Sequence, residues 1–216
     1  VVLEADTGRV VAMASQPTYD PATWVGGVSK AQLARLYSTK AGTPLLSRAT
    51  QGQFAPGSTW KPIMSVGALN HGFSPSTRLD CSAGLQVGNR YFKNYESASY
   101  GLIGFDRALQ ISCDTFFYRV GLSLWQRYGS DPTDMHAKDP LVAEAKGFGF
   151  GRATGIDLPG EAAGRIADRR WKLAYWRAMK DYYCKLDREP GSDYLHLFAH
   201  EFCLEGSYYR AGDAVN

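Results

Sequence analysis

A mixed α+β fold is predicted, because strand-like segments lie near the amino end and helical periodicity follows them. Val1–Ala5 and Val10–Ala14 are β-prone runs separated by the turn Asp6-Thr7-Gly8-Arg9, a spacing typical of a β-hairpin. From Phe105 onward, apolar residues recur at helical spacing. Strands followed by helices, without a strict βαβ alternation, favour the α+β class.

The stretch between these segments is predicted to hold two short helices and an irregular region. Ala31–Tyr37 has the pattern of a short helix. Ile63–Asn70 is the second, and Gly72 stands where a helix commonly places its left-handed C-terminal glycine. Thr77–Tyr100 is expected to be irregular to β, since Gly and Asn recur throughout it.

The helical pattern beyond Phe105 is interrupted at Ser112-Cys113-Asp114. Because Ser and Asp prefer helix starts to helix interiors, two consecutive helices are expected to meet there. Leu141–Lys146 is predicted to be a short helix, and Thr154–Gly160 a strand that leaves a turn. The segment from Trp171 to Tyr209 carries much of the aromatic content.

Composition excludes several classes of function. The net charge is only +3, with 21% charged residues and no block of lysines or arginines, so nucleic-acid binding is not expected. No apolar run approaches the ~20 residues that a membrane-spanning helix needs. The chain begins inside a strand-like run and ends without a terminating signal. We therefore expect it to be part of a longer protein.

The four cysteines do not form a metal-ligand pattern. Cys81, Cys113, Cys184 and Cys203 contain no C-x-x-C pair, so a zinc site is not expected. Cys113 lies in an apolar helical stretch and is expected to be a buried free thiol. Cys184 and Cys203 are able to pair in an oxidising compartment, and the sequence leaves that pairing open.

The stretch APGSTWKP, residues 55–62, pairs a serine with a lysine at a helix start. Ser58 and Lys61 are three positions apart, so they share one helix face. Pro62 is tolerated only near the first turn, which places the helix start close to Ser58. Free backbone N–H groups there can stabilise a nucleophilic oxygen and an oxyanion, and a lysine can take the serine proton. The alternative is an ordinary helix cap with a surface lysine, because about one S-x-x-K arises by chance in such a chain.

A second constellation lies 54 residues downstream of Ser58, at Ser112 and Asp114. An activated serine needs a second hydroxyl to pass a proton and a polar group to hold the lysine, and S-x-D supplies both on one short loop. The alternative is a plain N-cap for a helix that starts near Thr115.

These motifs resemble those of the penicillin-binding proteins. APGSTWKP resembles the active-site serine motif, for which P-P-G-S-T-F-K-P is a common form, and Ser112-Cys113-Asp114 resembles the S-x-N motif in the S-x-D variant of elongation-type class B members. The stretches LEADTGRVVAMASQPTYDP and KGFGFGRATGIDLPGE, and Tyr209–Asp213, are similar to further segments of the family. The resemblance covers most of residues 1–170 and the last few residues.

The resemblance implies a β-lactamase/transpeptidase-like fold, in which an antiparallel sheet is flanked by helices beside a helical subdomain. Residues 1–216 would form an incomplete transpeptidase domain, with residues 171–208 as an aromatic-rich insertion that packs on the core or forms a substrate or partner surface. The family's third motif, K-[ST]-G, is absent, since Lys40-Ala41-Gly42 lies upstream of Ser58. The membrane anchor and pedestal domain of class B members are also expected outside these residues.

The resemblance further implies roles for four residues. Ser58 would be the acylated nucleophile, Lys61 its general base, Ser112 the proton relay and Asp114 the group that holds Lys61. The implied reaction is peptidoglycan D,D-transpeptidation of D-Ala-D-Ala stem peptides, with acylation by β-lactams and no metal or organic cofactor. The implied setting is the extracytoplasmic face of the bacterial cell membrane, with membrane-embedded wall-elongation proteins as partners and no nucleic acid.

Three other functions remain open at this point. A serine β-lactamase or D,D-carboxypeptidase uses the same first motif with water as the acceptor, although no Glu stands in a recognisable deacylation loop. A penicillin-sensing module would be acylated without turnover. A structural fragment with an accidental S-x-x-K would form no covalent adduct.

Overall fold

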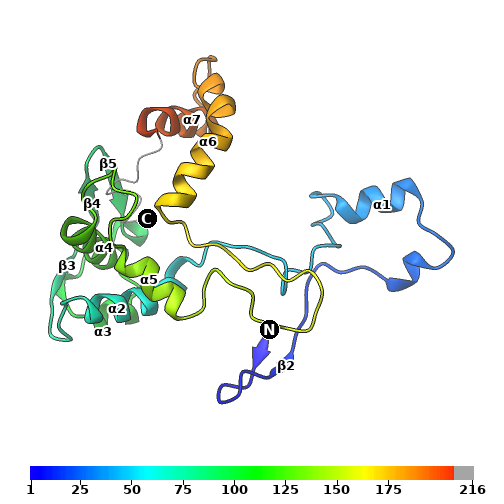
Figure 1. Cartoon of the computed structure of the whole chain (residues 1–216), viewed down its shortest axis with the longest axis horizontal. Coiled ribbons are helices and arrows are strands. Elements are labelled where there is room, and N and C mark those ends of the chain that lie inside the picture. The colour runs from blue at the N-terminus through cyan, green and yellow to red at the C-terminus, as the bar shows by residue number, and fades with distance from the viewer. Residues whose placement is uncertain (207–216) are drawn as a thin grey trace. The chain divides into compact units, whose positions relative to one another are not determined.

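The computed structural model describes residues 1–206. The chain divides into two compact units: unit 1 consists of Val1–Ala55 with Gly151–Arg165, and unit 2 of Pro56–Phe150 with the chain from Ile166 onward (Figure 1). Among the described residues, no helix has the length and apolar character needed to cross a bilayer.

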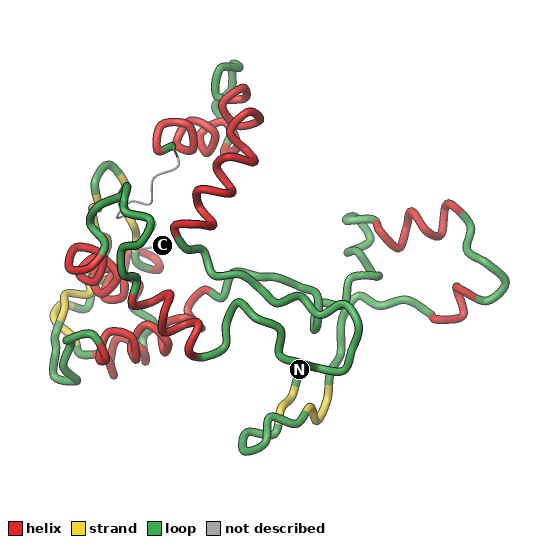
Figure 2. The backbone as a smooth tube through the Cα atoms, viewed as in Figure 1, coloured by secondary structure: helices red, strands yellow, loops and turns green. Residues whose placement is uncertain are grey.

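Unit 1 is mostly loop and begins with the predicted hairpin (Figure 2). Strands β1 (Val2–Leu3) and β2 (Val10–Ala12) pair antiparallel, with Leu3 opposite Val10. The strands are shorter than expected, and all five of their residues are exposed. The hairpin prediction is therefore confirmed, with a shorter paired region.

The helix of unit 1 is α1 (Lys30–Tyr37), as predicted to within one residue. It starts with a capping box, in which the Gln32 N–H donates to Ser29 Oγ while the Ser29 N–H donates to Gln32 Oε1. These two hydrogen bonds satisfy donors that have no partner within the helix. A short 3-10 helix, η1 (Pro21–Trp24), precedes it.

The strand predicted at Thr154–Gly160 does not form. The backbone N–H of Thr154 donates to Glu161 Oε1 at 2.6 Å, and that of Gly155 donates to Glu161 Oε2 at 3.3 Å. Because a carboxylate takes up these donors, the segment forms a turn rather than pairing with a strand. The prediction was wrong because the competing acceptor lies beyond the predicted strand.

The part of unit 2 up to Phe150 combines four packed helices with two small antiparallel sheets. The helices are α2 (Lys61–Asn70), α3 (Phe105–Gln110), α4 (Asp114–Tyr128) and α5 (Pro140–Gly147). Strand β3 (Leu79–Cys81) pairs with β6 (Gly101–Ile103), and β4 (Gly84–Val87) pairs with β5 (Arg90–Lys93). A 3-10 turn, η3 (Tyr95–Ser97), lies between β5 and β6. The α+β class is confirmed, although each sheet in the described residues has only two strands.

The core of unit 2 is built around α4. Phe116 and Phe117 are fully buried, and each contacts Phe105 of α3 edge-to-face at ring-centroid distances of 5.0 and 6.5 Å. Helix α5 approaches α2 closely at Gly67, where a Cβ atom would lie 3.0 Å from the Leu141 side chain. This core fixes the ends of α2 and α4, which carry the two motifs.

The segment from Trp171 folds as a helical hairpin, α6 (Arg169–Leu186) and α7 (Tyr194–Glu205). Cys184 and Cys203 form a disulfide that joins the two helices, so the pairing that the sequence left open is present. Tyr183 of α6 packs against Phe198 and Phe202 of α7, at ring-centroid distances of 5.1 and 4.9 Å. The expected role of residues 171–208 as an insertion stays a prediction.

The expectation of a free thiol at Cys113 was wrong. Cys113 is buried as predicted, but it forms a disulfide with Cys81, 32 residues upstream in β3. The helical pattern around Cys113 carries no information about β3, because the disulfide depends on the packing of α4 against that strand.

Candidate active site

Ser58 and Lys61 lie where a 3-10 turn becomes a helix. The turn η2 (Gly57–Trp60) leads directly into α2, of which Lys61 is the first residue. Gly57 has a φ of 55°, a left-handed conformation that glycine adopts without penalty. The predicted helix start near Ser58 is confirmed. Ser58 is exposed, whereas Lys61 is only 6% exposed.

The amine of Lys61 is the centre of a cluster that it forms with Ser58, Ser112 and Asp114. Its Nζ lies 3.1 Å from Ser58 Oγ, 2.9 Å from Ser112 Oγ and 2.5 Å from Asp114 Oδ1. It also donates to the Ser112 backbone carbonyl at 2.6 Å. A lysine is almost never buried unless its charge is paired, and here the Asp114 carboxylate pairs it. The four residues that the sequence predicted are thus brought together around one nitrogen.

Ser112 takes part through an unusual backbone conformation. It is the first residue after the C-cap of α3, with a φ of 55°. The Ser112 N–H donates to the Leu109 carbonyl at 3.2 Å, and the Cys113 N–H donates to the Ala108 carbonyl at 2.9 Å. This pair of bonds is a Schellman motif, in which the left-handed position is usually a glycine. A serine there costs about 1–3 kcal/mol, and it turns the hydroxyl toward Ser58, to which Ser112 Oγ donates at 2.8 Å.

Asp114 is the first residue of α4, directly after the N-cap Cys113. The predicted meeting of two helices at this turn is therefore confirmed. The Asp114 carboxylate also affects Tyr118, one helical turn further on. Burial raises the pKa of Tyr118 above its ordinary value of 10.0, and the charge of Asp114 raises it further.

Asn94 is a site-supporting residue that the sequence reasoning missed. It is 5% exposed, and its Oδ1 accepts the backbone N–H of Asp114 at 2.9 Å. The Cys81–Cys113 disulfide was missed as well. Neither carried a local signal, because Asn94 and Cys81 lie 20 and 32 residues before their partners in a region read only as irregular to β.

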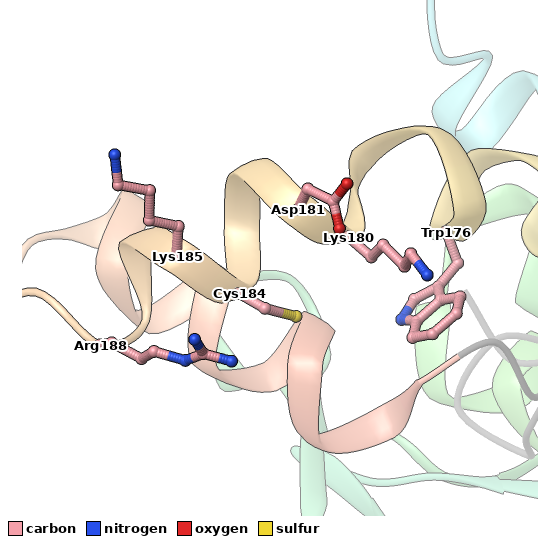
Figure 3. Close-up of a pocket in the computed structure, with 6 residues that line it drawn as sticks. All are labelled: Trp176, Lys180, Asp181, Cys184, Lys185 and Arg188. Atoms are coloured by element: carbon pink, nitrogen blue, oxygen red, sulfur yellow. The ribbon is translucent and has the colours of Figure 1, made fainter.

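A cavity on α6 and the residues just beyond it contains none of the predicted site residues. This cavity of about 300 Å³ is lined by Trp176, Lys180, Asp181, Cys184, Lys185 and Arg188. The Lys180 ammonium lies beside the Trp176 ring, 5.5 Å from its centroid (Figure 3). No hydroxyl or free thiol lines this cavity, so it holds no nucleophile comparable to Ser58. Residues 1–206 also contain no group of three His, Cys, Asp or Glu side chains placed to hold a metal ion.

Known proteins are similar to this chain in both sequence and fold. The penicillin binding protein transpeptidase domain family matches residues 1–182. Peptidoglycan D,D-transpeptidase MrdA of Escherichia coli strain K12 is 34% identical over 175 residues, which is 80% of this chain and 26% of that protein. The chain therefore spans about a quarter of the length of this curated relative.

Two solved structures extend the likeness along the chain. The crystal structure of Pseudomonas aeruginosa PBP2 in complex with WCK 5153 covers 99% of this chain and 43% of its own, with a TM-score of 0.66 and 28% identity. A structure described as structural coordination of polymerization and crosslinking by a peptidoglycan synthase complex covers 99% of this chain and 32% of its own, with a TM-score of 0.63 and 27% identity.

The family match ends at residue 182, within the segment expected to be an insertion, and the similarity expected at Tyr209–Asp213 lies outside the described residues. The matched range includes both Ser58 and Ser112. The chain belongs to the penicillin-binding protein transpeptidase domain family, and within it to the elongation type.

Proposed function

We propose that this chain carries the acyl-transfer centre of a peptidoglycan D,D-transpeptidase. Ser58 forms an acyl-enzyme with D-Ala-D-Ala stem peptides, and β-lactams acylate the same oxygen. The observation that supports this most is the burial of Lys61, whose Nζ contacts two hydroxyls and one carboxylate. A surface lysine beside a helix cap would not bring these three groups together.

Acylation begins with proton transfer from Ser58. Lys61, in its neutral form, takes the proton from Ser58 Oγ across 3.1 Å, as the oxygen attacks the carbonyl carbon of the penultimate D-Ala. When the C–N bond to the terminal D-Ala breaks, its nitrogen needs a proton. Ser112 Oγ lies within hydrogen-bond distance of both Ser58 Oγ and Lys61 Nζ, so it delivers that proton and receives another from Lys61.

The second half reverses these transfers. An amine of a second stem peptide attacks the acyl carbon and forms the new amide bond, while the ester bond between that carbon and Ser58 Oγ breaks. The proton that it loses returns to Ser58 Oγ through Ser112 and Lys61. Asp114 holds the lysine in place through both halves, because it pairs the ammonium formed at each proton transfer.

The oxyanion of the tetrahedral intermediate needs hydrogen-bond donors. The Ser58 N–H belongs to the first turn of the η2–α2 helix, where backbone donors have no intrahelical acceptor. In the family, the second donor comes from the strand that carries the K-[ST]-G motif. We place that strand, together with the membrane anchor and pedestal domain, in the full-length native protein.

The proposed cellular location and partner proteins follow from the peptidoglycan substrate. A relative was solved within a peptidoglycan synthase complex, and we propose that the full-length protein works with membrane-embedded wall-elongation proteins. Its catalytic domain would lie at the extracytoplasmic face of the bacterial cell membrane. The proposed steps use four side chains and require neither a metal nor an organic cofactor.

The proposal is tested with the full-length protein and two substrates. A labelled penicillin should add one acyl group per molecule, and a D-Ala-D-Ala stem peptide with an acceptor amine should release D-Ala and form a new amide. Fast hydrolysis of the penicillin adduct would instead indicate a β-lactamase, and an adduct without peptide turnover would indicate a sensor. Absence of any adduct, or an undiminished adduct in Ser58→Ala, would refute the proposed nucleophile.

A further inference from the structure

We infer that the Cys81–Cys113 disulfide and Asn94 form a brace that positions the Ser112–Asp114 turn for acyl transfer. The brace consists of these three residues. This inference rests on the proposed function, since it concerns the geometry around Lys61. It assigns a positioning role to groups that touch neither substrate nor the reacting atoms.

The covalent part of the brace lies between two site residues. Cys113 is flanked by Ser112 and Asp114, and its sulfur is bonded to Cys81 at the end of β3. Both cysteines are fully buried, and their Cα atoms are 6.2 Å apart, within the ordinary range for disulfides. The turn is therefore tied to a strand and not only to its two flanking helices.

The strand that anchors the disulfide is itself fixed. Cys81 pairs with Gly101 in the β3–β6 sheet, and β6 leads directly into α3. Helix α3 then ends in the Schellman motif that delivers Ser112 and Cys113. The disulfide thus closes a loop that starts at β3 and returns to it through β6, α3 and the turn.

Asn94 supplies the hydrogen-bonded part of the brace. Its Oδ1 accepts the Asp114 N–H at 2.9 Å, while its Nδ2 donates to the Ala98 carbonyl at 2.8 Å and contacts Cys81 Sγ at 3.5 Å. Every polar atom of this buried amide is therefore engaged, which fixes its orientation. Asn94 links the residue that bears the carboxylate to the residue that bears the disulfide.

The turn needs such support because its conformation is unfavourable for serine. With a φ of 55°, Ser112 occupies a region where a side chain is strained, and an unsupported turn would relax toward right-handed or extended conformations. Either change would move Ser112 Oγ away from Lys61 and Ser58. Catalytic groups must be held within ~0.5 Å of their productive positions, so the loss should appear in the chemical step.

The test compares two disulfides in the full-length protein. Cys81→Ala with Cys113→Ala, the brace variant, removes the covalent part of the brace, and Cys184→Ala with Cys203→Ala removes the disulfide between α6 and α7 as a matched control. Stopped-flow measurements with a fluorescent penicillin separate the acylation rate constant from the affinity of the non-covalent complex, and thermal unfolding reports on folding. We expect the acylation rate constant to fall by ~10- to 100-fold in the brace variant. Its non-covalent affinity should change less than about twofold, and the control should acylate at the wild-type rate.

A second variant keeps both disulfides. Asn94→Ala removes the acceptor of the Asp114 N–H and should lower the acylation rate constant by ~10-fold, again without weakening the non-covalent complex. Asn70→Ala is its control, because Asn70 is an exposed residue whose side chain donates to Glu144 instead.

Three results decide the inference. A folded brace variant that acylates at the wild-type rate overturns it. If that variant does not fold, a wild-type acylation rate constant in Asn94→Ala overturns it. If the wild-type protein forms no adduct at all, both the proposed function and this inference are refuted. If the brace variant and Asn94→Ala both acylate at the wild-type rate, the inference is refuted but the proposed function is not.

Discussion

Lys61 and Lys180 each lie on a helix of unit 2, and their surroundings differ in ways that matter for chemistry. Lys61 is buried, and its nitrogen meets oxygens from two other segments, the η2 turn and the Ser112–Asp114 turn. Lys180 is exposed, lies over the Trp176 ring and lines a cavity whose other residues come from α6 and the residues just beyond it. A cation in water is only weakly affected by its neighbours, whereas a buried one responds strongly to them. We therefore attribute the reactivity of Lys61 to its burial and to the contacts that the η2 turn and the Ser112–Asp114 turn make with its amine.

Removing each lysine in turn tests whether the surroundings of the two amines determine their reactivity. We expect Lys61→Ala to lower the rate of penicillin acylation by roughly 10²–10⁴-fold, because Ser58 loses the base that takes its proton. Lys180→Ala should acylate within about twofold of wild type, since its cation contacts no predicted site residue. Equal losses in the two variants would mean that burial and convergence do not distinguish the lysines.

The core around α4 and the α6–α7 hairpin should also differ in how much the truncation of one side chain lowers the free energy of unfolding. Phe116 is fully buried in the core that supports the cluster, and Phe116→Ala should lower the free energy of unfolding by about 3–5 kcal/mol. Leu197 of α7 is 60% exposed, and Leu197→Ala should change it by less than about 0.5 kcal/mol. Urea denaturation followed by circular dichroism measures both. A large effect at Leu197 would show that the hairpin's outer face is covered in the full-length protein.

The smallest expected effect is a change in the pKa of Tyr118 when the charge of Asp114 is removed. Because the charge of Asp114 adds to burial in raising the pKa of Tyr118, Asp114→Asn should bring that pKa part of the way back toward 10.0. The tyrosine is neutral below its pKa, so the variant should form phenolate at lower pH than the parent protein does. NMR titration of labelled tyrosine carbons measures this shift. An unchanged pKa of Tyr118 would contradict a contribution of Asp114 to it.

The sequence predicted the parts of the site that local spacing determines. Ser58 and Lys61 share a helix face because they are three residues apart, and Ser112 and Asp114 mark a break between helices because of their own conformational preferences. Family resemblance then joined the two motifs. The two motifs meet at Lys61 Nζ only because α2 packs against α4. Neither motif encodes that packing by itself.

The features that sequence reasoning missed depend on distant partners. Asn94 looks like a turn residue until the Asp114 N–H is placed against it, and Cys113 looks like a free thiol until β3 brings Cys81 alongside. The strand wrongly predicted at Thr154–Gly160 has a different, local cause, since Glu161, the next residue, accepts hydrogen bonds from the backbone N–H groups of Thr154 and Gly155. Local pattern identifies candidates, and tertiary contacts decide their partners.

Two hydroxyls lie within hydrogen-bond distance of Lys61 Nζ, and we propose that only the Ser58 hydroxyl attacks the substrate. Ser58 is exposed and sits in the first turn of the η2–α2 helix, whereas Ser112 is half-buried behind it. The direct test is peptide mapping by tandem mass spectrometry after labelled penicillin has reacted with the full-length wild-type, Ser58→Ala and Ser112→Ala proteins. We expect the acyl group on Ser58 in wild type, slower labelling of the same residue in Ser112→Ala, and none in Ser58→Ala. An acyl group found on Ser112, or one that persists without Ser58, would contradict it.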